Sequence, residues 1–343
     1  MRPIFSNPGI DLGSRGFSLV ELMIAMTLGL LVVLGVISIF VSTQQTYRAN
    51  SALSDVQEGS RVAFEMLARD IRSAGLAGCI STPGNRVANV ITGTPWYANW
   101  NDPIIGYDDA SADPALTGVS PAPVANTSSL HILSTGATSA TVSWTPGKSS
   151  SDIKINEATT DLSDGDIVMI CDYDHAAIVQ ISYNPANANL VHDKGGNLSP
   201  GNCSKGLGYP TDCSSANGNS YNFSPNAQIA KLTAHVWYIG VNPTGTKSLY
   251  RFNLSNSATA TQEMVRNVNN MQINYLLPPA SSFANATNIN ACTVTPPATD
   301  CWSNVSAAQL HLWLQSGFKF AGTNVKPLAR DFISTTTIRN RVQ

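Results

Sequence analysis

The sequence predicts an α+β fold in which one long N-terminal helix packs against an antiparallel, β-rich globular head. Residues 22–41 carry no charge and are long enough to cross a bilayer as a helix. Residues 44–75 repeat apolar side chains at the spacing of an amphipathic helix. Residues 76–343 hold short alternating segments separated by clusters of Asn, Gly, Pro and Ser, which is typical of strands and turns.

The composition restricts the classes of function. Of the 343 residues, 43% are hydrophobic, which is enough for a packed core, but only 12% are charged. Soluble domains usually carry about 25% charged residues, so the surface of this chain is mostly neutral and polar. The net charge is −2, and Lys and Arg form no runs. We therefore expect no nucleic-acid partner, because phosphate backbones are bound through basic patches.

Residues 1–16 have the character of a short leader, and residues 17–43 form the membrane half of the predicted helix. The leader holds two arginines against one aspartate, so the positive-inside rule keeps it in the cytoplasm. Residues 22–41 cover about 30 Å as a helix, which is one bilayer crossing. No A-x-A-like cleavage site follows Val41, and the apolar segment continues into a second helical pattern. We therefore expect the span to be retained and the rest of the chain to be exported.

Residues 44–75 predict the amphipathic half of the same helix. Its apolar positions recur at spacings of three, four and seven and comprise Leu53, Val56, Ala63, Leu67, Ile71 and Ala74. The polar positions between them are Arg61, Glu65, Arg69 and Asp70. Gly75 and Gly78 supply a stop. The stripe is also compatible with a coiled coil, but it ends before four clean heptads, so we expect it to pack on the head.

The head, residues 76–343, predicts an antiparallel sheet that is buried on one side. Strand-like segments occupy residues 128–135, 140–144, 167–171, 176–182, 231–240, 248–254, 271–277, 307–316 and 331–341. Alternation is clearest where Leu310, Leu312 and Leu314 face one way while Gln309, His311 and Trp313 face the other. Residues 263–270 suggest a short helix or turn. Residues 184–222 and 278–290 suggest long surface loops.

Six cysteines form an even set. Cys203 lies close to Cys213 in the sequence, and Cys292 lies close to Cys301, which favours local disulfides in an oxidising compartment. By elimination, Cys79 pairs with Cys171 and ties the end of the helix to the sheet. A zinc site would need CxxC or a Cys and His at short offsets, and neither close pair has that spacing.

The segment GFSLVELMIAM, residues 16–26, resembles the processing motif of type IV prepilins and type II secretion pseudopilins. That motif has a glycine, then an aromatic residue, then a glutamate at the fifth position of the mature chain. The resemblance implies cleavage between Gly16 and Phe17 by a prepilin peptidase, followed by N-methylation of Phe17. A plain signal anchor with a chance glutamate is the alternative, although carboxylates inside membrane spans are costly and rare.

The order of segments in the head is similar to the PilW family of minor pilins. It runs from GDIVMICDYDHAAIVQIS through SLYRFNL and EMVRNVNNMQINY to a threonine-rich strand that ends IRNR. The resemblance implies a pilin-like fold and a minor pilin that primes or supports type IV pilus assembly in a tip or initiation complex, with a part in twitching motility, adhesion or DNA uptake. The span departs from many major pilins because it has no proline, and only Gly29 and Gly35 weaken it.

The resemblance also implies partners and a location. The expected partners are other minor pilins, the major pilin, the prepilin peptidase and the inner-membrane assembly platform. The chain would cross the inner membrane once with its head in the periplasm, and then enter the pilus at the cell surface. Glu21 is the expected assembly residue, because in the family this carboxylate meets the N-terminal amine of a neighbouring subunit. Snorkelling to the headgroups is the alternative for Glu21.

No constellation of residues supports catalysis, a cofactor or a metal. Asp172, Asp174 and His175 sit at a turn between strands, where Asp is common for turn chemistry. Residues 161–166 resemble part of a calcium loop through Asp161, Asp164 and Asp166, but the spacing and the terminal glutamate are missing. We expect no enzyme. A type II secretion pseudopilin of the J type and a membrane-anchored adhesin or ligand-binding module remain the alternatives.

Overall fold

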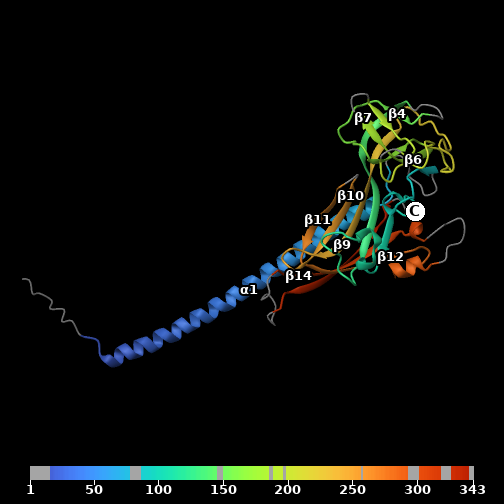
Figure 1. Ribbon diagram of the computed structural model, residues 1–343. Coiled ribbons are helices and arrows are strands. Elements are labelled where there is room, and N and C mark those ends of the chain that lie inside the picture. Colours follow the sequence, from blue (N-terminus) through green and yellow to red (C-terminus); the bar gives the residue numbers. More distant parts are fainter. Residues whose placement is uncertain are drawn as a thin grey trace, which may run out of the picture.

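The computed structural model describes residues 16–77, 86–144, 150–184, 188–195, 198–255, 258–292, 301–317 and 326–339. Helix α1 (Leu19–Ser73) is 55 residues long, and its N-terminal half extends away from a β-rich head (Figure 1). It ends at Ser73, and Gly75, two residues later, adopts a positive φ of 68°. This left-handed position is the usual place for a glycine after a helix, so the predicted stop is confirmed.

The strands of the head are β1 (Arg86–Asn89), β2 (Ile104–Tyr107), β3 (Ser129–Trp144), β4 (Asp152–Ile155), β5 (Ile167–Cys171), β6 (His175–Gln180), β7 (Ser182–Asn184), β8 (Asn189–Val191), β9 (Gln228–Val241), β10 (Lys247–Ser255), β11 (Ala258–Arg266), β12 (Val268–Leu276), β13 (Ala284–Asn285), β14 (Ala307–Gln315) and β15 (Ala329–Thr337). The short helices are α2 (Ala286–Asn290) and the 3₁₀ turns η1 (Trp96–Ala98), η2 (Ala110–Ala112), η3 (Pro114–Leu116) and η5 (Trp302–Asn304).

The strands form two sheets. The larger sheet has the order β1-β6-β5-β9-β3-β4-β8-β7, with β10 and β11 continuing from β9 and β2 added to β3. The smaller sheet has the order β13-β12-β14-β15. Neighbouring strands are antiparallel except that β1 runs parallel to β6. The predicted α+β class, with a long N-terminal apolar helix and an antiparallel β-rich head, is confirmed.

The head has two lobes (Figure 1). The proximal lobe comprises the C-terminal part of α1 with β2, β10–β15 and α2, and its core contains Val56, Leu67 and Ile71 of α1. The distal lobe comprises β1, β4–β8 and residues 198–227, and its main core contains no residue of α1. Strands β3 and β9 run through both lobes and pair along their length. The helix is therefore anchored to one lobe, and the other is attached through two long strands.

Several local expectations were wrong or incomplete. Residues 128–135 and 140–144 form one strand, β3, whose pairing with β9 shifts twice between Thr135 and Ala140. Residues 263–270 lie in β11 and β12, and the turn is confined to Asn267, which has a φ of 62°. The segment 184–222 is not simply a surface loop, because it includes β8 and the buried Asn202 and Leu207. The segment 278–290 includes β13 and α2.

Candidate processing and assembly site

The residues of the predicted cleavage site precede the helix. Gly16, Phe17 and Ser18 have no regular secondary structure, and Ser18 is extended, with a φ of −69° and a ψ of 142°. Phe17 is 80% exposed. A Cβ built on Gly16 would meet no atom within 4 Å, so packing within this chain does not require a glycine there. Gly16 and Phe17 are therefore exposed and lie outside the helix, where a peptidase can reach the bond between them.

Glu21 lies in the first turn of α1 and is exposed. The first turn of a helix carries unpaired N–H groups and a partial positive charge, which favours a carboxylate. Among the ion pairs of the described residues, none includes Glu21. The chain by itself thus leaves this carboxylate available for a cation that comes from elsewhere.

The N-terminal half of α1 has no contact with the head. An 18-residue window of the helix has a mean hydropathy of 2.8 and none of it is buried within the protein. The large apolar side chains from Leu19 to Val41 are all exposed. A helix that is apolar on every side and uncovered by protein needs another apolar surrounding, which can be lipid or the same helix of a neighbouring subunit.

The C-terminal half of α1 packs closely on the proximal lobe. Val56, Ala63 and Leu67 are buried as the sequence predicted, and Arg61, Glu65 and Arg69 are exposed. A Cβ on Gly59 would approach Leu314 of β14 to 3.3 Å and Val265 of β11 to 3.6 Å. The helix therefore lies close to both sheets at this glycine.

Asp70 was expected on the polar face, but it is buried in the proximal lobe. Its Oδ2 accepts a hydrogen bond of 3.0 Å from Trp237 Nε1 on β9, and it lies 3.8 Å from a guanidinium nitrogen of Arg251 on β10. The Arg251 guanidinium also lies 5.8 Å from the centre of the Trp237 ring. Burial lowers the pKa of the neighbouring His235 imidazole, an effect that Asp70 opposes. This carboxylate therefore anchors the end of α1 to the sheet.

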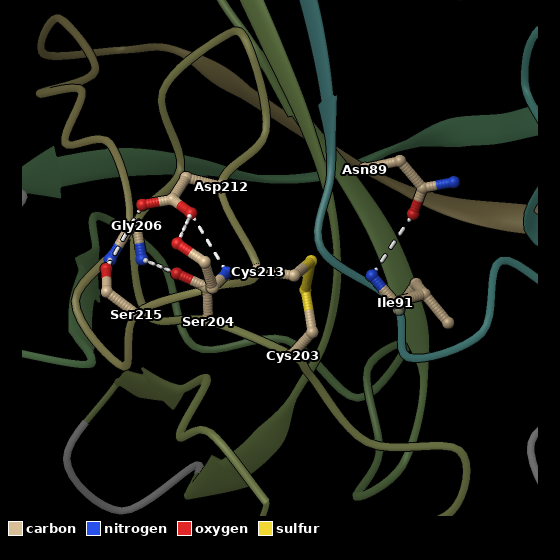
Figure 2. The surroundings of a disulfide bond; sticks show 10 residues. Asn89, Ile91, Cys203, Ser204, Gly206, Asp212, Cys213 and Ser215 are labelled. Atoms are coloured by element: carbon tan, nitrogen blue, oxygen red, sulfur yellow. Dashed lines mark hydrogen bonds between the residues drawn. A yellow bond between two sulfur atoms is a disulfide. The ribbon is translucent and has the colours of Figure 1, made fainter.

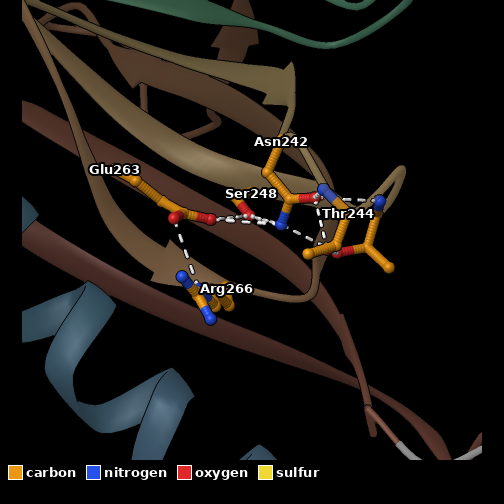
Figure 3. A network of polar contacts seen from close by, with 6 residues as sticks. Asn242, Thr244, Ser248, Glu263 and Arg266 are labelled. Carbon is orange, nitrogen blue, oxygen red and sulfur yellow. Dashed lines mark hydrogen bonds and ion pairs between the residues drawn. The ribbon is translucent and has the colours of Figure 1, made fainter.

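A second polar network holds the β9–β10 turn against β11 (Figure 3). Glu263 accepts hydrogen bonds from the Ser248 hydroxyl at 2.7 Å and from the Asn242 amide at 3.1 Å, and it lies 3.3 Å from Arg266. Burial raises the pKa of Glu263, but these hydrogen bonds and Arg266 outweigh it and hold the pKa below its ordinary value. Because the folded state favours the ionised carboxylate, the network stabilises the fold above the ordinary Glu pKa and loses that contribution as the pH falls.

Two disulfides join the neighbouring cysteines, in the pairs that their spacing suggests. Cys203 bonds to Cys213 and Cys292 to Cys301, with Cα–Cα distances of 5.2 and 6.4 Å. Figure 2 shows the first pair, beside the carboxylate of Asp212, which accepts a hydrogen bond of 3.1 Å from Ser215. The Cys203 amide also donates to the carbonyl of Val90, next to β1. The disulfide therefore closes a loop of the distal lobe, and the Cys203 amide attaches that loop to the chain next to β1.

Cys171, at the end of β5, is also disulfide-bonded, and the predicted partner, Cys79, lies outside the described residues. A peptide map of the non-reduced protein is expected to link Cys79 to Cys171 and to show both local pairs. Each loop of about ten residues restricts the unfolded chain by roughly 2 to 3 kcal/mol. A map in which the thiol of Cys79 or Cys171 alkylates without reduction would contradict the long pair.

The residues of the rejected catalytic constellation stabilise a tight turn. Asp172 accepts hydrogen bonds from the amides of Asp174 and His175 at 3.1 and 3.0 Å, and from the Tyr221 hydroxyl. The His175 imidazole is bonded to the carbonyl of Leu207 at 2.6 Å, and burial lowers its pKa. The Asp174 carboxylate lies 3.4 Å from Arg86 at the start of β1, so the side chains of all three residues have partners within the distal lobe.

Two of the three aspartates that resemble part of a calcium loop have side-chain partners in the protein. Asp164 accepts from the Tyr183 amide at 2.6 Å. Asp166 accepts from the Ser163 amide at 2.9 Å and pairs with Lys231 at 2.6 Å. Within the part of the chain that the structure describes, no three His, Cys, Asp or Glu side chains are grouped to hold a metal ion. The Asp166–Lys231 pair instead joins the start of β5 to β9.

Sequence reasoning missed the anchoring role of Asp70, although a signal for it was present. Asp70 lies seven residues after Ala63 and fourteen after Val56, so it continues the apolar stripe of the helix. A carboxylate at this position of the helix either is buried together with a polar partner or interrupts the apolar face. Gly59 was also missed, because a small residue on a helix gives no sign of what packs against it.

Two families match parts of the chain. The prokaryotic N-terminal methylation motif matches residues 12–37, and the type IV pilus-assembly protein W family matches residues 236–327. The second match begins in β9 and extends past β14, so it covers most of the proximal lobe. The distal lobe lies outside it. No curated protein and no solved structure matches the chain.

Proposed function

We propose that this chain, a PilW-type minor pilin related to the type IV pilus, primes or supports pilus assembly as part of a tip or initiation complex. The leader motif and the apolar helix indicate a protein that is anchored in the inner membrane through this helix. The pilus to which it is related lies on the cell surface. The proposal rests mainly on the N-terminal half of α1. This half follows a pilin processing motif, and its large apolar side chains from Leu19 to Val41 are exposed. Such a helix is suited to bundle with the helices of other pilins.

The proposed activity is association and not turnover. Other minor pilins, the major pilin, the prepilin peptidase and the inner-membrane assembly platform are the proposed partners. The size of the head supports a position near the filament tip, since residues 76–343 are bulky next to closely packed helices. Affinity purification of the detergent-solubilised chain, followed by mass spectrometry, tests this proposal. Recovery of type II secretion components in place of pilus components would contradict it.

The mature chain is expected to begin at N-methylated Phe17. The match to the N-terminal methylation motif covers residues 12–37, which supports cleavage between Gly16 and Phe17, and both residues are exposed and precede the helix. Intact mass spectrometry of the protein from a host with an active prepilin peptidase measures this directly. As a control, the same gene in a host without that peptidase should yield the full chain. A mature protein that begins after Val41 would contradict the proposed processing and remove the helix that assembly requires.

A further inference from the structure

Strand β15 is a long, regular edge of the smaller sheet. It pairs with β14 over nine positions, from Ala307 with Thr337 to Gln315 with Ala329, without any shift in register. It ends the strand order on that side. All but one of its side chains are at least partly exposed, and Ile333 is 60% exposed. Residues 332–337 contain no charge and no proline.

The hydrogen bonds to β14 determine which backbone groups of β15 are turned outward. At the two ends of the ladder, the Ser316 amide donates to Leu328 and the Ile338 amide donates to Ser306, both at 2.8 Å. Antiparallel pairs alternate between bonded and non-bonded positions, so the even-numbered residues of β15 bond to β14. The N–H and C=O groups of Asp331, Ile333 and Thr335 therefore point away from β14, toward the open edge.

The other strand edges among the described residues are short or irregular. Strands β1, β2, β7 and β13 have four residues or fewer. Strand β11 is long, but its register with β10 shifts at Met264, and it carries the Glu263–Arg266 ion pair. Bulges, charges and short length are the usual means by which proteins prevent strand addition at an edge. Strand β15 has no bulge, and it has no charge along residues 332–337; its charged residues, Arg330 and Asp331, lie near its start, where Asp331 is 3.2 Å from His311 of β14.

We propose that β15 is a docking strand, onto which an adjacent pilin subunit adds an extended strand of its head. This inference rests on the proposed function, since it names the surface through which the chain meets its neighbours. Helix α1 contacts β15, so this edge lies beside the helix along which neighbouring pilins are proposed to bundle. Nine residues of strand extend for about 30 Å, which requires a partner strand of similar length.

The chemistry of the edge specifies the partner segment further. Main-chain hydrogen bonds to Asp331, Ile333 and Thr335 would supply affinity, and alternate side chains would supply specificity. The outer face presents Ile333 beside His311 of β14, its neighbour in the register. A partner strand with an apolar residue opposite Ile333 and with no like charge opposite Asp331 fits this edge.

A proline at Thr335 tests the proposal at the level of the backbone. Thr335→Pro removes one outward N–H while leaving the inward hydrogen bonds of β15, and proline is tolerated at edges where the N–H faces solvent. Thr335→Ala is the matched control, because it removes the same side chain but keeps the N–H. Each full-length variant is purified in detergent after brief crosslinking in cells, and the recovered pilins are quantified by mass spectrometry. We expect at least tenfold less pilin with Thr335→Pro, and recovery within twofold of the unmodified chain with Thr335→Ala.

A second measurement does not depend on whether the proline variant folds. The photo-crosslinking residue p-benzoylphenylalanine is placed at Ile333 in an otherwise unmodified chain, and we expect it to capture a peptide from the head of another pilin. Equal pilin recovery with Thr335→Pro and Thr335→Ala, or crosslinks only to a second copy of this chain or to a non-pilin protein, would overturn the docking strand. If the unmodified chain recovers no pilins, the proposed function itself fails.

Discussion

Replacing Glu21 with alanine is expected to leave leader cleavage and membrane insertion largely intact while reducing incorporation into the pilin complex at least tenfold. An unpaired charge within the apolar part of the bilayer costs at least about 2.5 kcal/mol, so this carboxylate needs a partner. The proposed cleavage after Gly16 would create a positive amine on Phe17. In a bundle of helices, the amine of one subunit can offset the desolvation of Glu21 on the next.

This pairing would also fix the axial position of neighbouring helices. A slip of one helical turn, about 5.4 Å, would separate the two charges. Glu21→Gln is the matched variant, because it keeps the size and the hydrogen-bonding groups but removes the charge. It is expected to behave like Glu21→Ala, whereas Glu21→Asp should retain part of the incorporation. Co-purification with partner pilins, together with counts of pili per cell, measures the effect.

Normal co-purification and normal piliation in the Glu21→Ala strain would show that the charge pair is not needed. The snorkelling alternative makes that prediction, because a carboxylate that reaches the headgroups contributes nothing specific to helix packing. Intact mass of each variant supplies the control for processing. A variant that keeps its leader reports on the peptidase and is not informative about assembly.

Replacing Asp70 with alanine is expected to destabilise the proximal lobe by about 3 kcal/mol. The change leaves the Trp237 N–H and the Arg251 guanidinium without the carboxylate that both contact. Removing one partner of a buried ion pair usually costs about 3 to 5 kcal/mol. In a domain of this size, each kcal/mol corresponds to roughly 2 to 4 °C, so the unfolding midpoint should fall by about 10 °C.

Two variants make this measurement specific. Arg69→Ala changes the neighbouring exposed residue of α1, and it should alter the free energy of unfolding by no more than about 0.5 kcal/mol. Asp70→Asn keeps an acceptor for Trp237 but removes the charge near Arg251, and it should give an intermediate midpoint. Near-ultraviolet circular dichroism of the full chain in detergent follows the buried tryptophans. A midpoint for Asp70→Ala within 2 °C of Arg69→Ala would contradict the anchoring role.

The regular elements were predictable where one physical signal dominated. The absence of charge from residue 22 to residue 41 and the apolar stripe of residues 44–75 specified α1, and Gly75 specified its end. The alternation around Leu312 specified β14, whose buried and partly exposed residues alternate along its last eight positions. These signals depend on the chain's own periodicity, so no knowledge of distant contacts is needed to recognise them.

The strand boundaries were predicted wrongly where a bulge interrupts the alternation of buried and exposed side chains. In β11, the register shift places Met264 and Val265 consecutively against the core, so the period of two is broken and the segment looks like a helix or turn. In β3, two shifts around Gly136 and Thr138 separate halves that belong to one strand. The pairing partner decides whether a strand continues through such a position, and the partner β9 is about ninety residues away in the sequence.

The division of the head into two lobes affects which parts of the protein can accept amino-acid substitutions during evolution. The main core of the distal lobe is built without α1, and the family match is confined to the proximal lobe and the N-terminal segment. Substitutions in the distal lobe therefore need to preserve its own core, its disulfide and its attachment to β3 and β9, but no packing against α1 in that core. Selection can remodel the outermost surface of the head while the membrane helix and its anchor remain constrained.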